Sequence, residues 1–203
     1  MIGLAYQRPD DIKQAITANN NGTYTVDLRI LGRSKKYIIT NANENHGGSF
    51  TDKNGIWPKL YELAVIERNG RSWLFEGKGP GMGDGIPLLT GHDFTFNSNL
   101  LFGLGTLANS LQSKLERGTD GKKIMILGTG TKDIKIDGLK AGHVYTVLKY
   151  DKEKDRVYLR DPHGGTNDVP QNRTKTGLGS GPGEFYLTLQ ECDDAFQGLA
   201  IED

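Results

Sequence analysis

The hydrophobic pattern changes near residue 92, and this change limits the folds open to the chain more than any other feature. Before it, apolar residues mostly recur at helical spacing; after it, short apolar runs alternate with turn residues, as in antiparallel strands. The predicted fold class is therefore α+β. Residues 1–92 form a mainly helical first part with a β-hairpin, and residues 93–203 form an antiparallel β second part.

Helices are expected in the first part where proline or acidic residues precede an apolar stripe. The expected helices cover residues 1–7, 8–18 and 57–67, and Pro9 and Pro58 stand in the first turns of the last two. Thr23–Leu31 alternates between polar and apolar side chains, and Lys35–Thr40 is a second β-rich run after a short turn. These two runs predict the hairpin.

The second part is expected to begin with a helix that is capped by Asn97 or Ser98, runs to Lys114 and ends at Gly118. A short acidic helix is expected at Gln190–Phe196 and a long loop at Asp161–Gly183. The expected strands are Lys122–Leu127, His143–Tyr150, Arg156–Arg160, Glu184–Leu189 and Gly198–Ile201.

Charge and cysteine content exclude several classes of partner and site. Lys and Arg number 25, as do Asp and Glu, so no net charge attracts nucleic acid or an anionic membrane. The first apolar run stops at Tyr6, which fits neither a signal peptide nor a membrane span, and a cytoplasmic location is expected. A single cysteine excludes an intramolecular disulfide and a cysteine-based zinc site.

The four histidines show no metal-binding spacing, and no metal or other cofactor is expected from the sequence. His46, His92 and His163 fall in predicted loops, where a solvated imidazole is the usual case. His143 differs because it opens a predicted strand, from whose end a side chain can project into a cleft.

A hairpin formed by His143–Tyr150 and Arg156–Arg160 would bring Asp161 beside His143, because the charged turn between the strands aligns their far ends. A carboxylate that accepts one imidazole N–H leaves the other nitrogen to activate a thiol or hydroxyl. We therefore predict that the two side chains lie about 2.6–3.2 Å apart. The alternative is a structural His–Asp hydrogen bond that closes the hairpin.

Several segments resemble those of one protein family and occur in the family's order. Gly138–Val147 contains the run GLKAGHVYTV, and Val157–Gly164 reads VYLRDPHG. These resemble the histidine and asparagine segments of calpain-type, papain-like cysteine proteases. Further similar segments are Gly22–Val26, Trp57–Ala64, Thr90–Gly91 and Gly183–Phe196.

The resemblance implies a papain-like fold and a cysteine endopeptidase that acts on proteins or peptides. His143 takes the position of the general base, Asp161 that of the orienting asparagine, and His163 that of a tryptophan. Residues 93–203 correspond to the histidine-side subdomain and residues 1–92 to part of the cysteine-side subdomain. The family's nucleophilic cysteine would precede Met1, and Cys192 is expected to be a packing residue of the C-terminal acidic helix, so we expect this chain to lack peptidase activity.

Two functional hypotheses follow. The chain is the greater part of a calpain-like endopeptidase domain without its nucleophile, or it is a pseudoprotease that binds peptides or acts as a scaffold. Calcium enters by resemblance alone, since no ligands can be assigned to it here. If an N-terminal helix segment is lacking, a further expectation is an exposed apolar patch, through which the chain could self-associate, formed by Met1, Ile2, Leu4 and Ala5.

Overall fold

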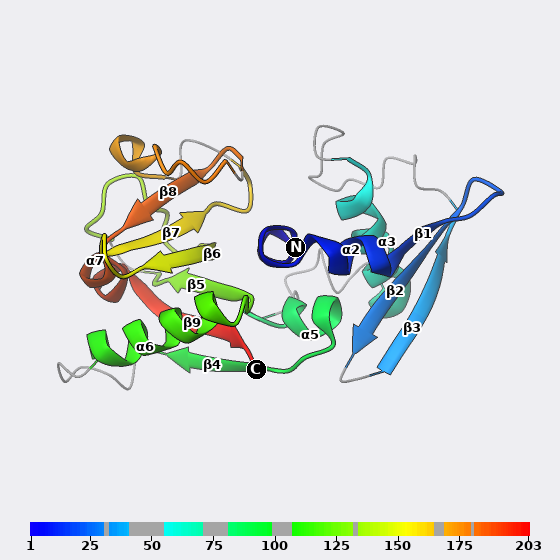
Figure 1. Ribbon diagram of the computed structural model, residues 1–203, viewed down its shortest axis with the longest axis horizontal. Helices are drawn as coiled ribbons and strands as arrows, with labels where there is room; N and C mark the ends of the chain where they lie inside the picture. Colours follow the sequence, from blue (N-terminus) through cyan, green and yellow to red (C-terminus); the bar gives the residue numbers. More distant parts are fainter. Residues whose placement is uncertain are drawn as a thin grey trace. The chain divides into compact units, whose positions relative to one another are not determined.

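The computed structural model combines helices with antiparallel sheets, which confirms the α+β class (Figure 1). It describes residues 1–30, 33–40, 55–70, 81–98, 107–131, 134–164, 169–179 and 181–203. The chain divides into two compact units, one made of Met1 and Gly3–Asp93 and the other of Phe94–Asp203 together with Ile2. In the described ranges, no helix is both long enough and apolar enough to cross a membrane.

The first unit combines a three-stranded antiparallel sheet with short helices. The sheet order is β1-β2-β3, and Ile16 pairs with Val26 and Tyr24 with Ile39. Its elements are α1 (Ile2–Gln7), α2 (Pro9–Ala15), β1 (Ile16–Ala18), β2 (Tyr24–Ile30), β3 (Arg33–Ile39), α3 (Trp57–Asn69) and α5 (Gly85–Thr90). The predicted hairpin and the helix that begins at Trp57 are confirmed.

Two expectations for the first unit are wrong. The second helix ends at Ala15, and Ile16–Ala18 forms a strand, because the β-branched Ile16 and Thr17 fit the edge of the sheet beside β2. The expected N-terminal apolar patch is wrong at Leu4, which is fully buried. Self-association through this segment stays a prediction.

The second unit is built on a six-stranded antiparallel sheet with the order β4-β9-β5-β6-β7-β8. Two helices, α6 and α7, contact each other and pack on strands of the sheet. The elements are β4 (Phe94–Ser98), α6 (Leu107–Asp120), β5 (Met125–Thr129), β6 (Val144–Asp151), β7 (Arg156–Arg160), the 3-10 helix η3 (Gln171–Arg173), β8 (Glu184–Leu187), α7 (Leu189–Ala195) and β9 (Phe196–Glu202).

The start of the second unit differs from the expectation. Asn97 and Ser98 do not cap a helix but end strand β4, where they pair with Leu199 and Gly198 of β9. The described helix α6 starts at Leu107, and residues 99–106, which the expected helix also covered, lie outside the described ranges. The pairing with β9 overrides the local capping signal, because a strand gains its backbone hydrogen bonds from a partner that is distant in sequence.

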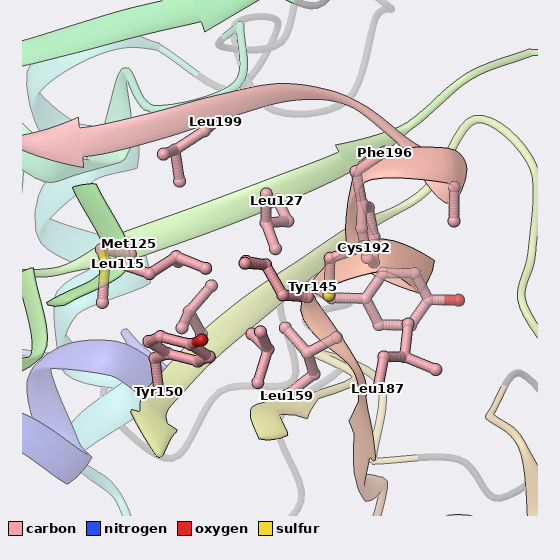
Figure 2. Close-up of a cluster of buried hydrophobic side chains, with 14 of the residues drawn as sticks. Leu115, Met125, Leu127, Tyr145, Tyr150, Leu159, Leu187, Cys192, Phe196 and Leu199 are labelled. Carbon is pink, nitrogen blue, oxygen red and sulfur yellow. The ribbon is translucent and has the colours of Figure 1, made fainter. Parts of the chain in front are cut away.

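The core of the second unit lies between the sheet and the two helices (Figure 2). Leu115 of α6 and Cys192 of α7 are buried with aromatic and aliphatic side chains of the strands, among them Tyr145 and Leu159. Fully burying one large apolar side chain contributes about 1.5–3 kcal/mol relative to exposure. This cluster therefore anchors β6 and β7, the two strands from which the candidate site projects.

Candidate functional site

His143 directly precedes β6, and Thr129 at the end of β5 holds its backbone. The His143 N–H donates to the Thr129 hydroxyl at 2.9 Å, and the Thr129 N–H donates to the His143 carbonyl at 2.9 Å. Gly142 immediately before it has a φ of 62° and donates its N–H to the Gly130 carbonyl. These contacts fix the direction in which the imidazole leaves the sheet.

Asp161 follows the last residue of β7 and starts a tight turn. Its N–H donates to the Gly183 carbonyl at 3.0 Å, and its carbonyl accepts the Gly164 N–H at 3.1 Å. The order of residues in this turn, Asp, Pro, His and Gly, suits a β-turn, since proline presets the second position and Gly164 adopts a positive φ of 64°. The turn therefore places the carboxylate at the end of the hairpin.

The structure brings the two predicted side chains together. His143 Nε2 lies 3.0 Å from Asp161 Oδ1, which confirms the predicted separation. The imidazole side chain is 9% exposed and the carboxylate is fully buried. On one side of the imidazole, the Tyr145 ring makes an edge contact with a centroid distance of 4.8 Å. The hydrogen bond is therefore largely screened from solvent, which strengthens it relative to an exposed pair.

The partner of Nε2 assigns the tautomer of the neutral imidazole. An ionised carboxylate only accepts hydrogen bonds, so Nε2 carries the proton and Nδ1 keeps the lone pair. Among the described residues, Nδ1 of His143 has no hydrogen-bond partner. The arrangement can thus take a proton at Nδ1 while Asp161 holds the ring through Nε2.

His163 contacts both His143 and Asp161, although it was predicted to be a solvated loop residue. Its backbone N–H donates to Asp161 Oδ1 at 2.9 Å. Its imidazole ring stacks on that of His143, with a centroid distance of 5.1 Å and an interplanar angle of 30°. The His163 side chain is 61% exposed, in agreement with the solvated imidazole predicted for it. This contact was not predicted, although the sequence Asp-Pro-His indicates it, because a turn at Pro162 folds residue i+2 back over residue i.

The second carboxylate oxygen of Asp161 is an exception to normal hydrogen bonding. Oδ2 is buried and has no hydrogen-bond partner in the described part of the chain. His143, Asp161 and His163 each offer one ligand atom, and these three atoms lie within 4.8 Å of one another. The group could therefore hold a metal ion as well as act on protons. His92 is exposed and outside this group, and His46 lies outside the described residues.

After Asp161 and His163, the chain reaches the helix η3, which makes an ion pair with helix α7. Arg173 of η3 makes two contacts with the Glu191 carboxylate of α7, one of them 2.6 Å long. Glu191 also completes a capping box with Thr188 at the start of α7. The hydrogen bonds from Arg173, followed by those from Thr188, lower the pKa of Glu191 from 4.5 to about 2.

Cys192, the single cysteine, does not belong to the site. Its side chain is fully buried in the hydrophobic core with Tyr145 and Phe196 (Figure 2). This burial, with the nearby charge of Glu191 as a smaller cause, raises the pKa of the thiol well above its ordinary value of 9.0. The thiolate is the reactive form, so Cys192 is a packing residue, as predicted from its place in the acidic helix.

Comparison with known proteins does not add a family assignment. No family model matches the chain, and no curated protein matches it significantly. A proposal about function therefore depends on the geometry of the site and on the motifs described above.

Proposed function

We propose that the chain is the histidine-bearing part of a calpain-like cysteine endopeptidase domain with a papain-like fold. His143 acts as the general base and Asp161 as the residue that orients it. The observation that carries the proposal is the 3.0 Å contact between His143 Nε2 and the buried Asp161 Oδ1, which leaves Nδ1 as the proton acceptor. The ordered motifs around both residues support the same family.

The geometry suits both proton transfers of thiol proteolysis. His143 Nδ1 takes the proton of a cysteine thiol, and the resulting thiolate attacks the carbonyl carbon of the scissile peptide bond. The imidazolium then returns its proton to the leaving amine as the C–N bond breaks, and water hydrolyses the thioester. The Asp161 carboxylate stabilises the imidazolium between these steps, because it contacts the N–H that the ring retains.

The thiol in this scheme is not Cys192, which is buried and packed in the core. The reaction needs a cysteine supplied by a segment outside the present sequence. The proposal therefore predicts no peptidase activity for the 203-residue chain by itself.

The second candidate function is that of a pseudoprotease which binds peptides without cleaving them or serves as a scaffold. Two observations favour it: the single thiol is inaccessible, and His163 stands where the family has a tryptophan. In this case the His143–Asp161 hydrogen bond is a structural closure of the hairpin.

The deciding experiment joins the cysteine-bearing helix segment of a calpain-type domain to Met1 and measures cleavage of a fluorogenic peptide. We expect the extended chain to cleave the peptide, His143→Ala to abolish cleavage, and Cys192→Ser to leave the rate unchanged. Replacing the added cysteine with serine is the control for contaminating activity, and circular dichroism checks the fold of each variant.

Three outcomes contradict the proposed peptidase. One is cleavage by the unextended chain that is lost on Cys192→Ser, and another is an extended chain whose cleavage survives His143→Ala. The third, peptide binding to the folded extended chain without cleavage, supports the pseudoprotease instead.

A further inference from the structure

The cluster of His143, Asp161 and His163 has the composition of a transition-metal site. Two imidazoles and one carboxylate are ligands that Zn²⁺ accepts, and three protein ligands leave a fourth position for water or another ligand. Ca²⁺ takes six to eight oxygen ligands, so a group with two nitrogens does not suit it. The chemistry of the donors therefore points to zinc rather than to the calcium implied by the family resemblance.

The distances in the cluster approach those of a tetrahedral site. Bonds of about 2.0–2.2 Å to zinc place neighbouring ligand atoms roughly 3.3–3.5 Å apart. Asp161 Oδ1 lies 3.0 Å from His143 Nε2 and 3.7 Å from His163 Nδ1. One ligand atom of each residue lies within 4.8 Å of the others. His163 is 61% exposed, so its ring can move the remaining distance without disturbing the core.

A separate observation, the unpaired oxygen of Asp161, also points to a cation. The carboxylate is fully buried, Oδ1 serves both histidines, and Oδ2 has no partner among the residues described. Buried polar atoms without a partner are rare, and they call for an explanation such as a bound ion or water. A divalent ion bound at Oδ1 would compensate the negative charge that the carboxylate shares between Oδ1 and Oδ2.

We propose that His143, Asp161 and His163 bind one Zn²⁺ ion. His163 is the distinguishing ligand, because the tryptophan of the resembled family offers no metal-binding atom at this position. When zinc binds to Nε2 of His143, the proton on Nε2 moves to Nδ1 and the ring remains neutral. The lone pair that would accept a thiol proton is then lost, so zinc switches off the base. This last consequence depends on the proposed peptidase function; the binding of zinc does not.

Calorimetric titration of the 203-residue chain with Zn²⁺ tests the site directly, without any activity. We expect saturation at one ion per chain and at least about a 30-fold loss of affinity in His163→Phe, because a ring without a ligand atom replaces one of three ligands. His92→Ala is the matched control, since it removes an exposed histidine outside the cluster, and it should keep the wild-type affinity. Co²⁺ in place of Zn²⁺ should give the intense visible bands of a tetrahedral complex.

Any of three results overturns the proposed zinc site: equal zinc affinity in the wild type and His163→Phe, loss of zinc binding in His92→Ala, or no saturable zinc binding. In the extended chain, zinc should inhibit peptide cleavage. The zinc concentration that halves the cleavage rate should be at least about 30-fold higher in His163→Phe than in the wild type. The rate of each protein is compared with its own rate without zinc. Zinc binding without cleavage by the zinc-free extended chain refutes the peptidase and leaves the site standing. Cleavage without zinc binding refutes the site and leaves the peptidase standing.

Discussion

Replacing Asp161 with alanine should release the His143 ring and destabilise the second unit. Asp161 Oδ1 accepts the His143 Nε2–H at 3.0 Å and the His163 N–H at 2.9 Å. Leaving the buried imidazole donor unsatisfied costs about 1–3 kcal/mol, and losing the partly buried backbone hydrogen bond costs about 1 kcal/mol. Removing a buried carboxylate with one unpartnered oxygen offsets part of this. The free energy of unfolding should therefore fall by about 1–3 kcal/mol.

Asp161→Asn is the matched comparison, because it removes the charge and keeps a carbonyl acceptor at the same place. Its unfolding free energy should stay within about 1 kcal/mol of the wild type. Urea unfolding should be followed through amide NMR signals of β6 and β7, since both tryptophans, Trp57 and Trp73, belong to the first part of the sequence. Nitrogen NMR of His143 should show an Nε2–H tautomer in the wild type and a mixture in Asp161→Ala. Equal stability of the two variants, together with an unchanged tautomer, would refute this role of Asp161.

Three further predictions concern the loop and the thiol. The hydrogen bonds from Arg173 hold the pKa of Glu191 at about 2, below its ordinary value of 4.5. They therefore stabilise the fold fully above pH 4.5, and this stabilisation is lost as the pH falls toward 2. Glu191→Gln should thus lower the unfolding free energy by about 1–2 kcal/mol at neutral pH, allowing for solvent screening, and by much less near pH 2; a pH-independent difference in urea unfolding contradicts this. Gly183→Ala should lower the free energy of unfolding by about 2–3 kcal/mol, because Gly183 has a φ of 82° and an added Cβ would lie 3.2 Å from the Gly164 Cα. Gly177→Ala, where φ is 73° and the surroundings are open, should cost only about 1 kcal/mol. Equal decreases in melting temperature for the two variants would show that the close approach to Gly164 has no cost. Cys192 should react with a thiol reagent only on unfolding, because it is fully buried and its thiol pKa is raised; rapid labelling of the native chain would show that it is accessible.

The contact between His143 and Asp161 could be predicted from the sequence because its determinants are local. Two apolar runs flank a charged turn, and the end of one run faces the start of the other. The predicted strand Arg156–Arg160 agrees with β7 at both ends. A bulge between Val147 and Lys149 was not predicted, because it shifts the register without changing the polar and apolar pattern outside it.

The missed features depend on partners that are distant in sequence or on side-chain placement. Asn97 and Ser98 have the residue types of helix caps, and only the pairing with β9 makes them part of a strand. Ile16 fits a helical stripe as well as a strand, and its contact with β2 decides between them. His163 belongs to the site through the turn at Pro162, which the sequence Asp-Pro-His indicates but the spacing between the histidines does not.

The hairpin that joins β6 and β7 also bears on the order in which the second unit can assemble. His143 and Asp161 are 18 residues apart, whereas Thr95 of β4 and Asp203 beyond β9, which are hydrogen-bonded, are 108 residues apart. Closing the longer loop costs roughly 1.6 kcal/mol more in chain entropy, by the logarithmic dependence on loop length. The two site residues can therefore meet while the β4–β9 edge of the sheet is still open, so their encounter does not wait for the longer loop to close.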